Sequence, residues 1–226
     1  MFYRILRTSG FACVLLLMPG LLGGCASRGK LGNFTTVVVD AGHGGHDPGA
    51  RSRYSPVEKI VALDTALRLE RILQDAGFRV VMTRRTDVFI PLGQRAAIGN
   101  RAGNAIFVSV HYNWAPRSGA RGLETFYFNS VSRPLAVSIQ RELTSLPGAV
   151  DRGARTARFH VLRNSKQPAV LVEGGFLTNP AEGGLVSSAA YRERVAQAVA
   201  TGIIRARTGG TTGLAGGAST RSNRRN

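Results

Sequence analysis

The stretch VVVDAGHGGHDPGA at residues 37–50 runs from an apolar segment into a loop rich in glycine. Val37 to Val39 are typical of a short strand buried on both faces, because a continuous apolar run bounded by turn residues suits such a strand. The glycines that follow allow a sharp turn and a close approach to a ligand. In open α/β sheets, ligands bind at the carboxyl ends of strands. His43 is therefore a candidate metal ligand or catalytic base, although a loop histidine that only forms hydrogen bonds fits the same residues.

Outward from this stretch, segments with strand and helix periodicity alternate along the chain. Ser55 and Asn179 each stand three residues before a glutamate, in the pattern of a helix capping box. Strands that alternate with helices indicate a single α/β domain with a mostly parallel, twisted sheet covered by helices on both faces. The segment at 148–157 is predicted to be irregular. We expect strands at residues 35–40, 79–83, 105–110, 122–128, 159–162 and 169–172, and helices at 56–76, 92–102, 133–146 and 189–207.

The composition limits the class of protein. The chain of 226 residues is long enough for one domain with a sizeable core, and its formal net charge is +17. Such a charge favours anionic partners such as nucleic acid, acidic lipid or an anionic wall polymer. No nucleic-acid-binding motif accompanies the charge and aromatic residues are sparse, which argues against nucleic acid as a partner. The glycine spacing matches neither the P-loop nor the GxGxxG pattern.

The amino terminus has the pattern of a targeting segment. Two arginines precede an apolar run at residues 11–17, which is too short to span a bilayer. Small residues then lead into Cys25, and this resembles a bacterial lipoprotein signal in which Cys25 becomes the lipid-bearing first residue. Ordinary secretory cleavage and an uncleaved anchor are the alternatives. Because Cys13 would leave with the signal, the mature chain would have no cysteine pair for a disulfide.

Three of the expected strands lead into reactive side chains. Because the carboxyl ends of parallel strands meet at one edge of a sheet, His43, His111 and Glu173 are predicted to converge. Two imidazoles and a carboxylate suit zinc, although ligands scattered along a chain are a weak signal. Glu173 also fits a general base with a raised pKa, or a turn cap, and Glu58 fits a helix cap. We expect His46 in an exposed loop, and His160 in a weak strand where it has a structural role.

Taken together, these motifs resemble the zinc-dependent N-acetylmuramoyl-L-alanine amidases of bacterial cell walls. The resemblance runs in order from about residue 35 to residue 207. It is carried by VVVDAGHGGHDPGA, the Glu58-Lys59 pair, FVSVHYNW, GLETFYF, FHVLRNSKQPAVLVEGGFLTNPAE and the closing helix.

This resemblance implies a set of roles. His43, Glu58 and His111 would bind zinc, and Glu173 would be the catalytic glutamate. Asp40 would lie behind the site, where an acid can orient a ligating imidazole. The implied reaction is hydrolysis of the amide between N-acetylmuramic acid and L-alanine in peptidoglycan.

The chain departs from the family pattern at a few positions. Ala41 stands where the family usually has proline, and Tyr112 stands where it usually has a small residue. We expect Tyr112 and Trp114 at the rim of the cleft, where their bulk could alter substrate fit. No inserted inhibitory helix is recognisable between Gly122 and Pro147, so we expect an open site.

The predicted organisation has four parts: a signal segment at 1–25, a linker at 26–34, a catalytic domain at 35–207 and a basic disordered tail at 208–226. We expect a monomer bound to peptidoglycan and to a membrane through a lipid anchor, with a protein activator as a further partner. An aspartate directly after the lipid-bearing cysteine is associated with retention in the inner membrane. Because Ala26 is not an aspartate, the expected location is the periplasmic side of the outer membrane in a cell with two membranes. Two other functions remain open: metal-dependent hydrolysis of another peptidoglycan bond, and non-catalytic peptidoglycan binding by a lipoprotein.

Overall fold

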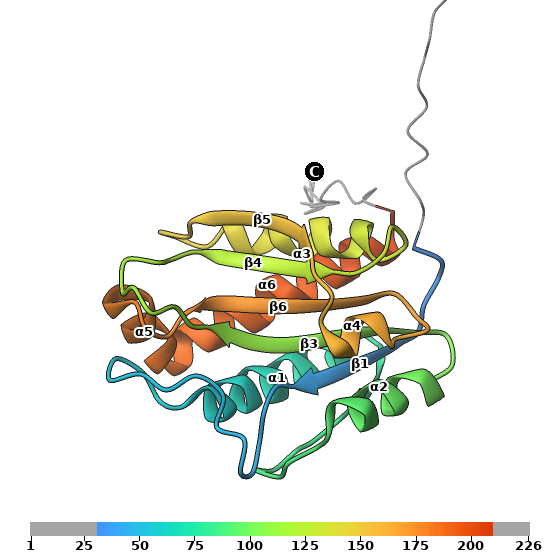
Figure 1. Cartoon of the computed structure of the whole chain (residues 1–226). Coiled ribbons are helices and arrows are strands. Elements are labelled where there is room, and N and C mark those ends of the chain that lie inside the picture. The colour runs from blue at the N-terminus through green and yellow to red at the C-terminus, as the bar shows by residue number, and fades with distance from the viewer. Residues whose placement is uncertain (1–30, 210–226) are drawn as a thin grey trace, which may run out of the picture.

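The structure, a computed structural model, describes residues 31–209. A six-stranded sheet with the order β2-β1-β3-β6-β4-β5 forms its centre (Figure 1). The strands are β1 (Thr36–Ala41), β2 (Arg79–Met82), β3 (Ala105–Asn113), β4 (Leu123–Tyr127), β5 (Asp151–Thr156) and β6 (Ala169–Phe176). The helices are α1 (Glu58–Asp75), α2 (Leu92–Arg101), α3 (Arg133–Thr144), α4 (His160–Arg163), α5 (Pro180–Ser187) and α6 (Ala189–Arg207).

The sheet is mostly parallel, as predicted. Strand β1 pairs in parallel with β2 and with β3, and β3 pairs in parallel with β6. Strand β4 runs antiparallel to β6, and β5 runs parallel to β4. The carboxyl ends of β1, β3 and β6 therefore lie at one edge of the sheet. In Figure 1 the arrowheads of β1 and β3 point to the same side of the molecule, where α5 also lies.

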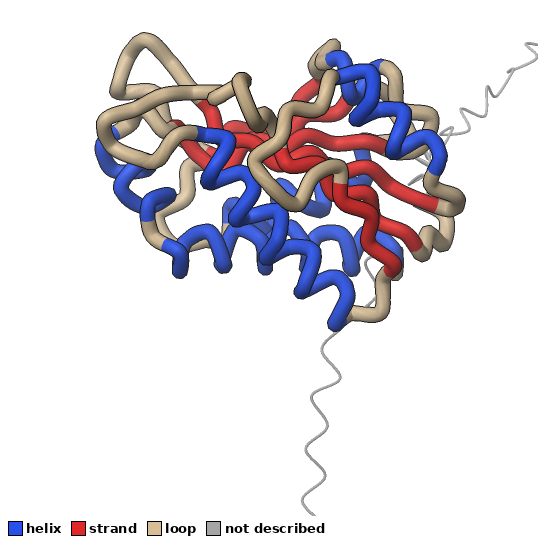
Figure 2. Tube along the Cα trace, turned by 90° about the horizontal axis from the view of Figure 1, so that it is seen from below, coloured by secondary structure: helices blue, strands red, loops and turns tan. Residues whose placement is uncertain are grey.

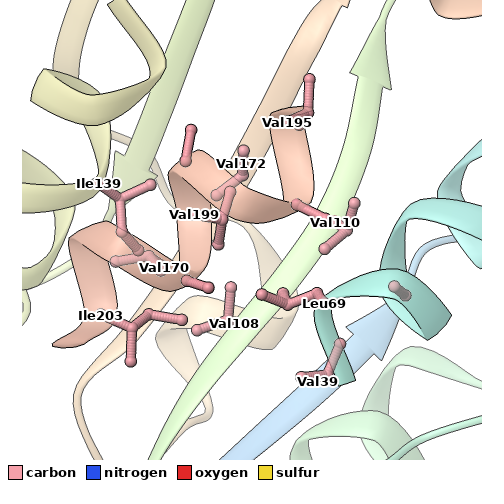
Figure 3. Packing of buried hydrophobic residues seen from close by; sticks show 14 of the residues in the cluster. Val39, Leu69, Val108, Val110, Ile139, Val170, Val172, Val195, Val199 and Ile203 are labelled. Atoms are coloured by element: carbon pink, nitrogen blue, oxygen red, sulfur yellow. The ribbon is translucent and has the colours of Figure 1, made fainter. Parts of the chain in front are cut away.

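Helices cover both faces of the sheet, which confirms the predicted α/β architecture (Figure 2). Alternate residues of each strand point to opposite faces. On one face, Val39 and Val108 pack under α1 and α6 in the main hydrophobic core (Figure 3). On the other face, Val38 and Phe107 belong to a smaller cluster beneath α2 and α4. This smaller cluster ends at Leu171 in β6, two residues before Glu173, and it leaves the carboxyl edge of that face free for a site.

Two segments differ from the sequence-based expectation. Residues 151–156, expected to be irregular, form the edge strand β5, which pairs only with β4 and therefore needs no alternation of apolar residues. A strand was expected at 159–162, but residues 160–163 form one helical turn, α4, in which Val161 and Leu162 are both buried. A short apolar run does not distinguish these two conformations.

The expectation for Tyr112 is wrong. Strand β3 extends to Asn113, and the side chain of Tyr112 is 1% exposed within the main core. Its hydroxyl lies 2.7 Å from the Thr65 hydroxyl, and its ring lies against Gly174, where a Cβ atom would come within 2.7 Å of the ring. Tyr112 therefore stabilises the contact between α1, β3 and β6 and does not line a cleft. Trp114, three residues after His111, is 52% exposed, in line with the expectation.

The expectations for the signal segment, for Cys25 and for nearly all of the basic tail fall on residues that lie outside the described part of the chain. The last helix, α6, has the predicted bounds. Among residues 31–209, no helix combines the length and the apolar character needed to cross a bilayer.

The packing of α6 on α3 gives a test of the fold. A Cβ atom at Gly202 would lie 2.5 Å from the Ile139 Cα, so we expect Gly202→Ala to lower the free energy of unfolding by about 1–3 kcal/mol through overpacking. Gly184 in α5 has no neighbouring atom within 4 Å of its would-be Cβ, so Gly184→Ala should leave stability unchanged or raise it by up to about 1 kcal/mol. Denaturant unfolding measures both, and equal effects would contradict this packing.

Candidate metal centre

Three side chains from separate elements meet at the carboxyl edge of the sheet. His43, Glu58 and His111 each offer one ligand atom, and these three atoms lie within 4.8 Å of one another. The Glu58 Oε1 atom lies 3.1 Å from His43 Nε2 and 3.0 Å from His111 Nδ1. The structure thus brings together the residues that the resemblance assigned to zinc. Two converging imidazoles and a carboxylate are a donor set suited to a divalent metal.

Glu58 is held by its neighbours and does not cap its own helix. Helix α1 begins at Glu58 with Val57 as the N-cap residue, and the Ser55 hydroxyl donates to the Pro56 carbonyl. The expected capping box is therefore absent from this helix. The Glu58 carboxylate instead accepts hydrogen bonds from the backbone N–H groups of Ala50, at 2.8 Å, and Tyr112, at 3.1 Å. These bonds tie the loop after β1 to strand β3 through one buried side chain.

The tight turn after β1 aims His43 at Glu58. His43 has a φ of 57°, in the left-handed region that a residue with a side chain rarely adopts. Its Nδ1 lies 2.8 Å from Asp47 Oδ2, and Gly44 and Asp47 exchange backbone hydrogen bonds that close the turn. Because Asp47 holds Nδ1, the ring nitrogen that faces Glu58 is Nε2.

The acid that orients this imidazole is Asp47, so the expectation for Asp40 is wrong in detail. Asp40 lies behind the site, as expected, but it accepts hydrogen bonds from the hydroxyls of Thr83 and Ser109 and from Arg95. The missed signal is local, because Asp47 stands four residues after His43 in the same glycine loop.

Two glycines make room for the donors. A Cβ atom at Gly42 would overlap the imidazole of His111. A Cβ atom at Gly49, whose φ is +64°, would lie 2.5 Å from Glu58 Oε2 and 2.6 Å from His43 Cδ2. The loop can therefore close around the donor atoms only because these positions lack side chains.

Two buried arginines, which were not predicted from the sequence, bind the loop that carries His43. Arg84 donates to the carbonyls of Ala41 and Gly42, at 2.9 and 2.6 Å, and also to that of Lys59. Arg95 donates to the carbonyls of Ala41 and His43, each at 2.6 Å. These bonds fix three successive carbonyls of the loop that carries His43. The burial of Arg95 could have been inferred from the helical pattern, because Arg95 lies on the same buried face of α2 as Ala96 and Gly99.

Glu173 lies beside the three donors. It is paired in register with His111 of β3 on one side and with Glu124 of β4 on the other. Its Oε2 atom is buried and receives no hydrogen bond from any group in the described part of the protein. Burial raises the pKa of Glu173 well above its usual value, and the negative charges of Glu58 and Glu124 add to this effect. Glu173 is thus a buried carboxyl group whose Oε2 atom has no hydrogen-bond partner among residues 31–209.

The charges within the cluster have the signs that cation binding requires. Burial alone would favour the neutral acid, yet hydrogen bonds from His111 and His43 hold the pKa of Glu58 well below its usual range. Burial likewise opposes protonation of His43, but Glu58 and Asp47 raise the pKa of this imidazole. Glu58 is therefore ionised, and the site attracts positive charge.

The remaining histidines lie apart from the cluster. His46 is exposed, and its ring lies 4.0 Å from the ring of Phe89 between centroids. His160 is exposed at the start of α4 and does not lie within a strand.

The comparisons with known proteins all indicate the same family. The sequence profile described as N-acetylmuramoyl-L-alanine amidase matches residues 37–205. The N-acetylmuramoyl-L-alanine amidase LytC of Bacillus subtilis (strain 168) is 36% identical over 173 residues, which are 75% of this chain and 35% of that protein. This chain therefore spans about a third of the length of that curated relative.

Solved structures give the same result. The catalytic domain of CwlV, an N-acetylmuramoyl-L-alanine amidase from Bacillus (Paenibacillus) polymyxa var. colistinus, aligns with a TM-score of 0.73 and 37% identity, covering 76% of this chain and 97% of that domain. The CwlD amidase of Clostridioides difficile, solved in complex with the GerS lipoprotein, aligns with a TM-score of 0.74 and 30% identity, covering 77% and 98% of the two chains.

The arginine contacts beneath the loop predict an effect on metal affinity. Arg84 binds backbone carbonyls only, so Arg84→Gln tests loop positioning without breaking an ion pair. We expect it to weaken Zn²⁺ binding by roughly 10- to 100-fold, the usual effect of losing a group that supports the ligands. Competition with a chelator gives the dissociation constant, and Arg101→Gln, at an exposed arginine at the end of α2, is the charge-matched control. A folded Arg84→Gln protein that binds Zn²⁺ as tightly as the control would contradict this role.

Proposed function

The chain belongs to the N-acetylmuramoyl-L-alanine amidase family, and we propose from this that it hydrolyses the amide bond that joins the lactyl group of N-acetylmuramic acid to L-alanine in peptidoglycan. The observation that carries the proposal is the convergence of His43, Glu58 and His111 beside Glu173, whose buried Oε2 atom has no protein partner among the described residues. A metal site next to a group that can carry a proton is one arrangement that can hydrolyse an unactivated amide.

We propose zinc as the metal. His43 Nε2, one oxygen of Glu58 and a ring nitrogen of His111 would hold it, and three protein ligands of this kind leave a further position open. When bound, zinc supplies Lewis-acid polarisation of the scissile carbonyl and activation of the attacking water.

Glu173 would move the proton. Its raised pKa and its unpartnered Oε2 atom suit a carboxylate that takes a proton from water and then gives it to the leaving amine. The water oxygen would form a bond to the carbonyl carbon, the carbon–nitrogen bond would break, and one water proton would pass through Glu173 to nitrogen. The second proton would be released as the new carboxyl group ionises. The products are a lactyl carboxylate and a peptide with a free L-alanine amino terminus.

Other chemistry at the same site gives different products. A hydrolase of a peptide crosslink or of an N-acetyl group would release a different end group, and a non-catalytic peptidoglycan-binding lipoprotein would release none. The intact set of three donors with an adjacent unpartnered glutamate favours catalysis over binding alone.

The placement of the enzyme is also a proposal. We propose a signal at residues 1–25, lipidation of Cys25, a linker at 26–34, a catalytic domain at 35–207 and a basic tail at 208–226. The protein would then act as a monomer anchored at the cell envelope. Because the relative CwlD was solved in complex with a lipoprotein, a protein activator is also part of the proposal.

Matched substitutions separate the ligand from the proton carrier. Glu173→Gln keeps size and shape but removes the proton acceptor, so zinc content should stay at one per chain while turnover falls by roughly 10²–10⁴-fold. Glu58→Gln replaces a carboxylate ligand by a neutral amide, so zinc content and turnover should fall together. The measurements are elemental analysis, melting temperature and release of L-alanine amino termini from peptidoglycan. Near-normal turnover of Glu173→Gln would refute the assigned mechanism even with zinc bound.

The lipid anchor has its own test. In Cys25→Ser the thiol that would carry the lipid is lost, so the protein should move from the membrane fraction to the soluble envelope fraction. Intact-mass analysis should find lipid on the unaltered protein only. Unchanged fractionation, together with no added mass on the unaltered protein, would exclude lipidation.

A further inference from the structure

We propose that a cationic pocket beside the metal centre binds a free carboxylate of the substrate's stem peptide, and that it makes the enzyme selective for acidic peptides. We call it the arginine pocket and define it by Arg51, Arg53, Tyr54, Trp114 and Thr178. This inference rests on the proposed function, because the substrate that it specifies is the peptide side of the scissile amide.

The arginine pocket is a hollow of about 330 Å³, large enough for a charged group of a peptide. Its two main walls come from the segments that carry the metal donors. Arg51 follows Ala50, whose N–H binds Glu58, and Trp114 stands three residues after His111. Three extended residues span at most about 10 Å, so a peptide held at the metal centre reaches the pocket within two or three of its own residues.

The walls are fixed by contacts with neighbouring elements. The Ala115 N–H donates to the Thr178 hydroxyl, at 3.1 Å, which joins the loop after β3 to the segment after β6. The Ser187 hydroxyl donates to the Tyr54 carbonyl, and a Cβ atom at Gly183 would lie 2.9 Å from the Tyr54 Cβ. A pocket tied to α5 and β6 in this way is largely formed before a ligand arrives.

The arginines at the pocket have no acidic partner. Within residues 31–209, Arg51 and Arg53 form no ion pair, and the hydrogen bond and the ring contact of Arg53 are both with Tyr54. Some arginines elsewhere on the surface are paired, as Arg68 and Arg192 are with Asp64, and others are not. What sets Arg51 and Arg53 apart is that both line a hollow next to the segments that carry the metal donors. Unpaired guanidinium groups that surround a hollow are available for a carboxylate, which they bind through charge-assisted hydrogen bonds.

The chemistry of the substrate says which part of it is recognised. The lactyl carboxyl group is consumed in the scissile amide, so an unmodified glycan of N-acetylated sugars offers no charge near the reacting bond. Free carboxylates occur on the peptide side. Trp114, 52% exposed at the pocket, offers a flat apolar face for the peptide backbone and an indole N–H donor.

Binding is measured first, and without turnover. Trp114 is the sole tryptophan of the chain, so its fluorescence reports directly on this pocket. The first probe is a synthetic N-acetylmuramoyl tripeptide whose second residue is linked through its side-chain carboxyl, so that its α-carboxylate is free, and whose carboxyl terminus is an amide. The second probe is the same compound with that α-carboxylate as the carboxamide. In the Glu173→Gln background, calorimetry should give a dissociation constant roughly 10-fold lower for the carboxylate probe, with a change in indole emission. Raising the salt concentration should reduce this preference.

The variants locate the effect. Arg51→Gln combined with Arg53→Gln should abolish the preference for the carboxylate probe, while Arg101→Gln, which removes one exposed charge at the end of α2, should retain it. Equal affinity for the two probes, a preference that survives in the double variant, or binding without a change in indole emission would each overturn the proposal.

Activity separates this proposal from the one on which it rests. An unaltered enzyme that hydrolyses both probes with equal kcat/KM would overturn the arginine pocket and leave the amidase activity standing. Hydrolysis of neither probe would refute the proposed function, whereas the binding preference would still decide the pocket.

Discussion

The buried carboxylate of Glu58 is the group on which the rest of the site depends. One oxygen accepts the Ala50 N–H, and the other faces two imidazoles and the Tyr112 N–H. Burying a charge without partners is costly, so this side chain is stable only while the glycine loop and strand β3 supply their donors. Removing one partner from such a buried network typically costs about 3–5 kcal/mol. The loop, the helix that begins at Glu58 and the strand that ends in His111 are thus held in one arrangement.

The pleat of the sheet and two buried arginines complete this arrangement. Along β3 and β6, odd-numbered residues such as Phe107 and Leu171 face the thinner helix layer of α2 and α4. His111 and Glu173 continue the same rows beyond that layer, which places them at an uncovered edge with their partners in register. Arg84 and Arg95 then bind the carbonyls of the loop that presents His43. The sheet therefore positions His111 and Glu173, and the two arginines hold the loop with His43 beside them.

The sequence predicted what depends on local pattern and missed what depends on packing between elements. The run of β-branched valines in β1 identified a strand because turn residues bound it, and the long apolar face of α6 identified a helix by its period. Strand β5 was missed because an edge strand needs no apolar pattern. The burial of Tyr112 was missed because its ring packs against Gly174 of a neighbouring strand, and the sequence does not show this contact. The strand ends indicated His43 and His111 as candidate ligands, whereas Glu58 was named as a ligand from the family resemblance and otherwise fitted a helix cap. The arginines beneath the loop bind only through tertiary contacts, which a linear pattern does not encode.

The central claim is that His43, Glu58 and His111 form one metal centre. X-ray absorption at the zinc edge of the purified, zinc-loaded protein tests it most directly, because it reports the atoms bonded to the metal. We expect only nitrogen and oxygen atoms bonded to zinc, at about 2.0–2.2 Å, together with the outer-shell scattering of two imidazoles. In a His43→Ala protein the signal of one imidazole should disappear. Sulfur neighbours at about 2.3 Å, or a spectrum without imidazole scattering, would contradict the account.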